Sequence, residues 1–234
     1  MQTNTNLKTL FSTAILIDGA FFLNRYRKVF RNGRSHEPQK IVSNLYKMVM
    51  KHLDGAYLYR IIFYDCCPIS KKAHNPITKK AIDFSKTEQS LFRLQVFEEL
   101  KKKRKVALRL GYLNESNNWL IRPNKTKELL RGNLKIEDLK DEDVFYELKQ
   151  KGVDIKIGLD IASLAYKRMV QRIILISGDG DFVPASKLAR REGIDFILDP
   201  MWNPINPSLH EHIDGLKSVC ENPKKPFKNY PYLI

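Results

Sequence analysis

The stretch Ile174-Leu-Ile-Ser-Gly-Asp-Gly-Asp-Phe182 decides the fold class of this chain. A short run of branched apolar residues is typical of a parallel strand that is buried on both faces. Two aspartates, Asp179 and Asp181, follow where the apolar run ends, and Ala14-Ile-Leu-Ile-Asp-Gly19 places Asp18 in the same way. Ligands of open α/β sheets bind outside the carboxyl ends of the strands. The pattern therefore predicts an α/β fold with a mainly parallel sheet and an acidic site at its strand ends.

Two further acids lie just upstream, Asp154 and Asp160 in Lys151-Gly-Val-Asp-Ile-Lys-Ile-Gly-Leu-Asp160. Carboxylates that converge on one crevice repel one another and tend toward protonation unless a cation neutralises them. The motifs contain only hard oxygen ligands, without His or Cys, which favours Mg²⁺ or Mn²⁺ over zinc. We therefore expect a magnesium or manganese site of the kind that assists phosphoryl transfer.

Each of these acids also has a simpler interpretation. Asp181 could be the N-cap of a helix that begins at Val183, Asp160 could complement a helix dipole, and Asp154 could be an ordinary loop residue. An EF-hand is excluded because the further ligands and the final Glu of the calcium loop are missing. A phosphatase with an aspartyl nucleophile would need a second carboxylate after the first strand, where this chain has Asp18-Gly-Ala20.

The charge of the chain favours a polyanionic partner. Among its 234 residues, 41 are Lys or Arg and 26 are Asp or Glu, which gives a formal net charge of +15. A protein that neutralises phosphates gains affinity by releasing condensed counterions. The segment 71–105 holds eleven Lys or Arg against four acids, and we expect its loop lysines to contact nucleic acid (Lys71, Lys72, Lys79 and Lys80). The alternative is a solvated helix face with cations near its end.

The organisation of the chain predicts one large domain over residues 1–215 and a basic, proline-containing tail over 216–234. Strands are expected at 13–17, 57–64, 106–110, 118–121, 172–176 and 195–198, and helices at 21–30, 39–52, 87–103, 161–169 and 183–192. Residues 66–86 are expected to form a long polar connection, and 124–149 one or two short charged helices. Asp160 would lie in the first turn of its helix, and Trp119 in the core rather than on a base-stacking surface.

The three cysteines show no metal-ligand spacing, and an odd number fits a reducing compartment better than a disulfide scaffold. No apolar run approaches the ~18 residues of a membrane span. The sequence therefore predicts a cytoplasmic protein without a membrane segment.

Taken together, these motifs resemble the NYN domain of the PIN-like nuclease group. The resemblance rests on Asp18 with its strand, Lys151-Gly-Val-Asp154, the Asp160 helix, and Ser177-Gly-Asp-x-Asp-Phe-x-Pro184 followed by Ala189-Arg-Arg-Glu-Gly193. It implies a three-layer α/β/α sandwich and a magnesium-dependent ribonuclease centre. It assigns the metal to four acids (Asp18, Asp160, Asp179 and Asp181) and adds Asp154 to the catalytic group. Substrate contacts are expected from Ser177, Lys151 and the loop lysines.

One position departs from the family pattern. Many members carry Asn three residues after the first aspartate, where this chain has Phe21. The expected function is a metal-dependent ribonuclease acting on RNA, and a homo-oligomer is one of the states that the sequence leaves open. The alternative is a non-catalytic RNA-binding or regulatory module on the same fold.

Overall fold

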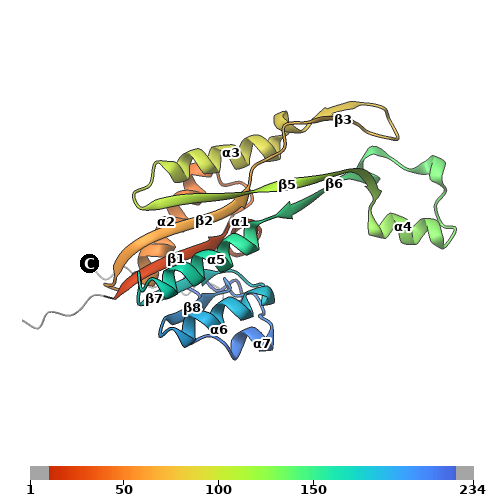
Figure 1. The fold of residues 1–234 in the computed structure, drawn as a ribbon. Helices are drawn as coiled ribbons and strands as arrows, with labels where there is room; N and C mark the ends of the chain where they lie inside the picture. The colour runs from red at the N-terminus through yellow and green to blue at the C-terminus, as the bar shows by residue number, and fades with distance from the viewer. Residues whose placement is uncertain (1–10, 225–234) are drawn as a thin grey trace, which may run out of the picture. The chain divides into compact units, whose positions relative to one another are not determined.

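The computed structural model describes residues 11–224, which form two compact units (Figure 1). The first unit contains the chain up to Asp65, Val96–Arg109 and the chain from Val153 onward. The second unit contains Cys66–Gln95 and Leu110–Gly152. Every acid that the sequence assigns to the metal site lies in the first unit.

A parallel sheet forms the centre of the first unit. Strand β1 (Ser12–Asp18) lies between β2 (Tyr57–Cys66) and β7 (Arg172–Ile176), and pairs with both in parallel. Strand β8 (Asp195–Asp199) and the short β9 (Gly215–Leu216) continue the sheet in parallel beyond β7. On the other side, the first residues of β5 (Val106–Ile121) follow β2. The predicted α/β fold with a mainly parallel sheet is confirmed.

Helices cover both faces of this sheet. In Figure 1, α5 (Val153–Tyr166) and α6 (Val183–Arg191) lie in front of it, whereas α1 (Gly19–Val29) and α2 (Pro38–Leu53) lie behind. The central strands are apolar and completely buried at Ile15–Ile17 and Ile173–Ile176, as a strand covered on both faces requires. Short helices η4 (Gly180–Phe182) and α7 (Pro207–His210) follow β7 and β8.

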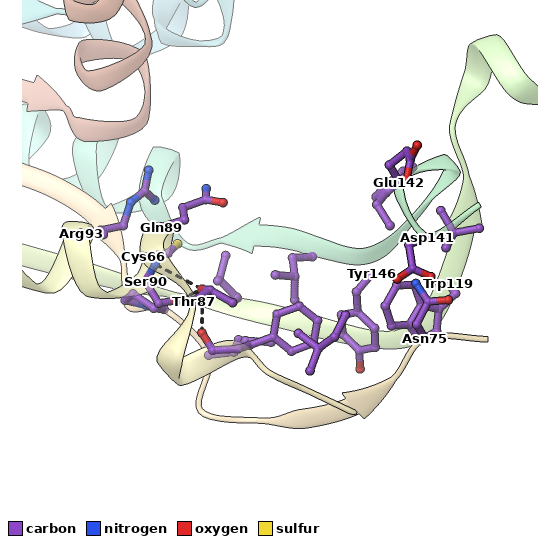
Figure 2. Close-up of a pocket in the computed structure, with 18 of the residues that line it drawn as sticks. Cys66, Asn75, Thr87, Gln89, Ser90, Arg93, Trp119, Asp141, Glu142 and Tyr146 are labelled. Carbon is purple, nitrogen blue, oxygen red and sulfur yellow. Dashed lines mark hydrogen bonds between the residues drawn. The ribbon is translucent and has the colours of Figure 1, made fainter. Parts of the chain in front are cut away.

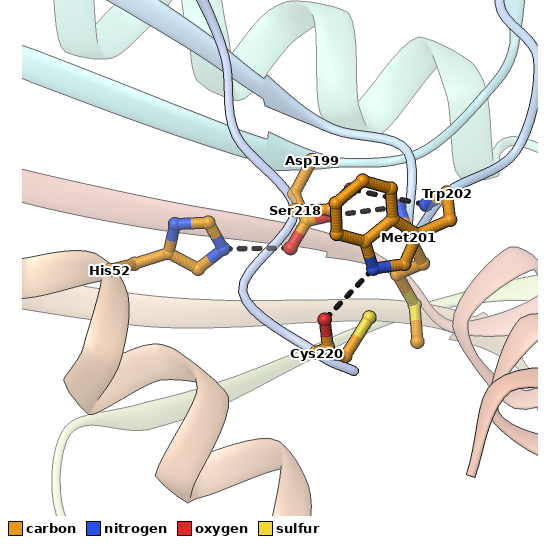
Figure 3. A network of polar contacts seen from close by, with 6 residues as sticks. All are labelled: His52, Asp199, Met201, Trp202, Ser218 and Cys220. Carbon is orange, nitrogen blue, oxygen red and sulfur yellow. Dashed lines mark hydrogen bonds and ion pairs between the residues drawn. The ribbon is translucent and has the colours of Figure 1, made fainter. Parts of the chain in front are cut away.

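A buried polar network fixes the chain that follows β8 (Figure 3). The Asp199 carboxylate is 2.8 Å from His52 Nε2, and it accepts hydrogen bonds from Ser218 Oγ at 2.9 Å and the Met201 amide at 2.7 Å. The Trp202 indole donates to the carbonyl of Cys220 at 2.8 Å. Since buried carboxylates need such partners, this network holds residues 218–220 against the end of the sheet.

The second unit is built on antiparallel pairs. Strands β3 (Lys72–His74) and β4 (Ala81–Asp83) form a hairpin, and the later part of β5 pairs with β6 (Val144–Lys151). Helix α4 (Pro123–Leu130) and the short helices η2 (Ile136–Asp138) and η3 (Asp141–Asp143) connect β5 to β6. Helix η1 (Phe84–Lys86) precedes α3 (Glu88–Lys101), whose first half belongs to this unit.

Several sequence predictions for this region are wrong. The strands expected at 106–110 and 118–121 are one strand of 16 residues, and β6 lies where charged helices were expected. The polar connection 66–86 contains a hairpin. The physical reason is pairing between segments distant in sequence: Trp119 lies opposite Tyr146, and their rings are 5.6 Å apart. Such cross-strand packing outweighs local propensity.

The position of Asp160 within its helix also differs from expectation. Helix α5 begins at Val153 because Val153, Ile157, Ile161 and Leu164 are buried at helical spacing. Asp154 therefore lies in the first turn, and Asp160 lies nearly two turns further along.

Candidate acidic site at the strand ends

Asp18 lies at the carboxyl end of the central strand and connects two elements. Its Oδ1 accepts a hydrogen bond from the Phe21 amide at 3.0 Å, which makes Asp18 the N-cap of α1. Its Oδ2 accepts a hydrogen bond from Ser177 Oγ at 3.4 Å. Ser177 is completely buried and follows β7, the neighbouring parallel strand. The first strand and the Ser177 loop therefore meet at one carboxylate.

The environment of Asp18 opposes its ionisation. The pKa of this carboxyl is raised to about 6, chiefly because burial removes its hydration. The negative charges of Asp154 and Asp65 raise the pKa further, whereas the hydrogen bonds from Phe21 and Ser177 lower it. A nearby cation would stabilise the ionised form of the Asp18 carboxyl.

Asp65 is an acid of this site that sequence reasoning did not assign. It follows Tyr64 near the end of β2, and Tyr64 is the residue paired with Asp18 in the parallel register. Its side chain is buried, with only 1% of the residue exposed. The signal was present in the sequence, because the apolar run Tyr57–Tyr64 ends in an aspartate just as the first strand does.

Asp154 connects the strand ends to the Asp179 loop. It is exposed in the first turn of α5. The pKa of its carboxyl is raised, first by desolvation and then by the negative charges of Asp179 and Asp181. The charges of the loop after β7 therefore raise the pKa of Asp154, and the charge of Asp154 raises the pKa of Asp18.

The loop after β7 presents its two aspartates to solvent. Asp179 Oδ1 accepts a hydrogen bond from the Asp181 amide at 3.1 Å and caps η4. Asp181 does not cap the following helix, because the N-cap of α6 is Phe182 and no side chain bonds there. The simpler interpretation of Asp181 as a helix cap is therefore wrong. Both carboxylates are exposed.

Asp160 has a different set of partners. Its Oδ2 accepts a hydrogen bond from the Tyr64 hydroxyl at 2.7 Å and lies 3.4 Å from Arg109 Nε. Burial raises the pKa of the Tyr64 hydroxyl, and the hydrogen bond to Asp160 raises it further. The structure thus surrounds Asp160 with a phenol and a guanidinium, and its assignment to the metal stays a prediction.

Phe21 lies against the glycine of the Ser177 loop. A Cβ atom added to Gly178 would come within 2.6 Å of Phe21 Cε2, and within 3.2 Å of the side-chain amide nitrogen of Asn203. Position 178 therefore requires glycine because the Phe21 ring lies too close for a Cβ atom, and not because of its backbone angles. Phe21 stands at the position where we expected Asn from the family resemblance, and it packs its apolar ring beside Ser177 and Asp179.

The predicted substrate-binding lysines belong to the second unit. Lys72 begins β3, Lys79 and Lys80 lie in the hairpin connection, and Lys151 ends β6, all exposed. Lys71 is half-buried, with its Nζ 5.4 Å from the centre of the Tyr146 ring. The structure thus gathers Lys71, Lys72, Lys79 and Lys80 around one hairpin.

The acidic cluster, defined as Asp18, Asp65, Asp154, Asp179 and Asp181, fits a hard divalent cation by its donor chemistry. It offers carboxylate oxygens only, and the charges of neighbouring members oppose the ionisation of Asp18 and Asp154. Within residues 11–224, however, no group of three or more His, Cys, Asp or Glu side chains is arranged to hold a metal ion. Direct coordination of one ion would require carboxylates to rotate toward it, or water molecules to bridge them.

Comparison with known proteins identifies the family of the chain. No curated protein matches the chain. A crystal structure of a protein of unknown function from Vibrio parahaemolyticus is similar, with 16% sequence identity, a TM-score of 0.45, and coverage of 94% of this chain and 96% of the other. None of the helices within residues 11–224 has the length and apolar composition needed to cross a bilayer. The model of the NYN domain matches residues 12–203, and the chain therefore belongs to the NYN domain family of the PIN-like nuclease superfamily.

Proposed function

We propose that this protein is a metal-dependent ribonuclease that hydrolyses RNA phosphodiester bonds at the acidic cluster. Membership of the NYN family associates the chain with nuclease-like, RNA-related function. The observation that carries the proposal is the state of Asp18, which burial and its acidic neighbours hold at a pKa of about 6 in a chain of net charge +15. Acids assembled against their own repulsion are characteristic of functional sites.

Four members of the cluster are proposed to hold Mg²⁺ or Mn²⁺: Asp18, Asp154, Asp179 and Asp181. When bound, such an ion lowers the pKa of a water molecule and neutralises charge on the scissile phosphate. Asp160 remains a predicted ligand through the family resemblance, and it would have to exchange Tyr64 and Arg109 for the ion.

The other predicted site residues would orient the acidic carboxylates and bind the RNA backbone. Ser177 donates a hydrogen bond to Asp18 and so orients this carboxylate. Lysines that contact phosphates give affinity and register with little sequence choice. This role is proposed for Lys151 and for the hairpin lysines. Lys72, Lys79, Lys80 and Lys151 are exposed, and Lys71 is half-buried.

The test is cleavage of end-labelled single- and double-stranded RNA and DNA in Mg²⁺, Mn²⁺ or chelator. Wild type should cleave RNA only with a divalent ion, and Asp179→Asn should lose at least about 100-fold in rate, as loss of a charge-stabilising group does elsewhere. Asp54→Asn is the matched control, because Asp54 is an exposed acid outside the cluster, at the end of α2. Cleavage in chelator, or full activity of Asp179→Asn, would refute the proposal.

A second candidate is a non-catalytic RNA-binding module. The observation that favours it is Phe21, whose ring packs on Gly178 beside the acids where related chains carry Asn. The apolar ring of Phe has no hydrogen-bond donor or acceptor. It can therefore neither bind a water molecule nor donate a hydrogen bond to a phosphate oxygen. In this case RNA would bind equally well in chelator and in Mg²⁺, and no cleavage would be seen with either ion.

A further inference from the structure

The second unit contains a cavity of about 530 Å³ that no part of the proposed nuclease site uses (Figure 2). This volume lies within the range of about 300–1,000 Å³ typical of small-ligand pockets. Residues from the β3–β4 hairpin, the start of α3, β5, β6 and the η3 turn line it. Every lining residue belongs to the second unit, so the cavity is a feature of that unit alone.

Aromatic rings line this cavity. Phe84 and Tyr146 have ring centres 5.1 Å apart, and the Trp119 ring meets Tyr146 edge-on at 5.6 Å. Trp119 is half-buried rather than enclosed in the core. Aromatic faces of this kind stack with unpaired nucleobases, at about 1–3 kcal/mol for each base.

Polar groups gather at one end of the cavity, where Figure 2 shows Asn75 and Asp141 beside Trp119 and Tyr146. Asp141 Oδ1 is buried and has no hydrogen-bond partner within residues 11–224. An unpaired buried carboxylate oxygen is costly, and a ligand that donates to it would remove the cost. Asp141 lines the cavity, so a ligand bound there can reach its carboxylate.

Asn75 adds a second polar group. Its residue is only 2% exposed, and its Oδ1 already accepts from the amides of Ile77 and Thr78 at 2.9 and 3.3 Å. The amide nitrogen is a donor. The polar end of the cavity thus combines a carboxylate acceptor with an amide donor.

The second unit has an excess of basic residues, 14 Lys or Arg against ten Asp or Glu. Six of these cations and only two of the acids lie in Cys66–Gln95. Arg93 and Arg122 line the cavity together with Asp141 and Glu142. Cations around an aromatic pocket suit a ligand that joins an aromatic base to phosphates.

We propose that this cavity binds one unstacked guanine base of single-stranded RNA, with Asp141 accepting from its Watson–Crick edge. Guanine presents two adjacent N–H donors there, which match one carboxylate, and its carbonyl lies beside them to accept from an amide such as that of Asn75. Adenine, cytosine and uracil each turn at least one acceptor toward the carboxylate. Unpaired bases are read in this way, by stacking together with edge hydrogen bonds. The choice of RNA as the ligand rests on the proposed function.

The experiment measures binding without cleavage. Labelled ten-nucleotide oligouridylates containing one central guanosine, one inosine or neither are titrated with protein in chelator, and fluorescence anisotropy gives the Kd. Wild type should bind the guanosine oligomer about tenfold more tightly than oligouridylate, in line with the discrimination of a well-placed bidentate pair. Inosine lacks the second donor and should fall between them. Equal binding of all three oligomers would overturn the proposal.

Two variants locate the effect. Asp141→Asn should abolish the difference between guanosine and inosine, whereas Glu137→Gln, an exposed acid of the same unit outside the cavity, should preserve it. A guanosine preference that survives Asp141→Asn would place the base elsewhere. If Asp141→Asn does not fold, the comparison of guanosine and inosine oligomers on wild type still tests the proposal. Because chelator prevents cleavage, a failed nuclease assay leaves this test intact, and a failed base preference leaves the nuclease proposal intact.

Discussion

The predicted functional side chains of the two units have opposite charges and lie on different kinds of support. The acids of the first unit lie at the ends of buried parallel strands and on a packed helix, where burial and mutual repulsion raise the pKa values of Asp18 and Asp154. The lysines of the second unit lie on and around an exposed hairpin. A charge held by a rigid core is sensitive to pH and to cations, whereas a solvated charge is sensitive mainly to salt. The two regions should therefore respond to different perturbations.

The largest expected effect concerns the hairpin. Replacing Lys71, Lys72, Lys79 and Lys80 by Gln should weaken binding of single-stranded RNA roughly 100-fold at low salt and reduce the salt slope by up to about 3, since each lost phosphate contact removes about 0.7. The loss should be similar for all sequences. Anisotropy titrations across a salt series measure both quantities. The control replaces Lys40, Lys47, Lys51 and Lys167, four exposed lysines of the first unit. An unchanged slope in the hairpin variant would move the RNA surface elsewhere, with the α1 arginines next to be tested.

The next effect concerns Asp18. Its carboxyl has a pKa of about 6 in the folded protein against 3.8 as the model value. The folded state therefore binds the proton more tightly, and wild type loses stability as the pH rises from about 4 through 6. Asp18→Asn removes the buried charge but keeps an acceptor for the Phe21 amide. It should raise the free energy of unfolding by about 1–3 kcal/mol at pH 7 and by little at pH 3.5.

Urea unfolding in chelator at several pH values measures this difference. Asp54→Asn serves as the control, since an exposed substitution is expected to stay within about 0.5 kcal/mol. A variant that is less stable than wild type at pH 7 would mean that the helix cap outweighs the desolvated charge.

The smallest effect is the response to metal. Millimolar Mg²⁺ or Mn²⁺ should raise the Tm of wild type by about 2–4 °C for each kcal/mol of binding free energy. The rise should shrink in Asp18→Asn and Asp179→Asn, although Asp18→Asn starts from a higher Tm in chelator. Differential scanning fluorimetry at matched ionic strength measures it, with NaCl as the reference. The hairpin-lysine variant should keep the full rise, and a rise that is equal in all variants would place the ion away from the acidic cluster.

The sequence by itself determined the first unit. The central residues of strands β1, β2, β7 and β8 are apolar because they are covered on both faces of the sheet. Such a run can be recognised without knowledge of its neighbours. The order of these strands along the chain, with acids where the strands end, was enough to predict the α/β sheet and to select Asp18, Asp179 and Asp181 as site residues. The motif upstream of β7 added Asp154 and Asp160 to that prediction. Asp65 could have been found by the same rule.

Only the tertiary structure decided the second unit and the grouping of the acids. Only the first half of strand β6 is apolar and its second half is polar. The strand exists because β5 pairs with it and because Tyr146 meets Trp119 and Phe84. Asp160 and Asp154 lie on one helix, yet Asp160 meets Tyr64 and Arg109 whereas Asp154 experiences Asp179 and Asp181. Local sequence encodes where a chain is buried, but the partner across a strand pair or around a carboxylate is set by segments distant in sequence. The aromatic cavity and the unpaired oxygen of Asp141 arise from the same long-range packing.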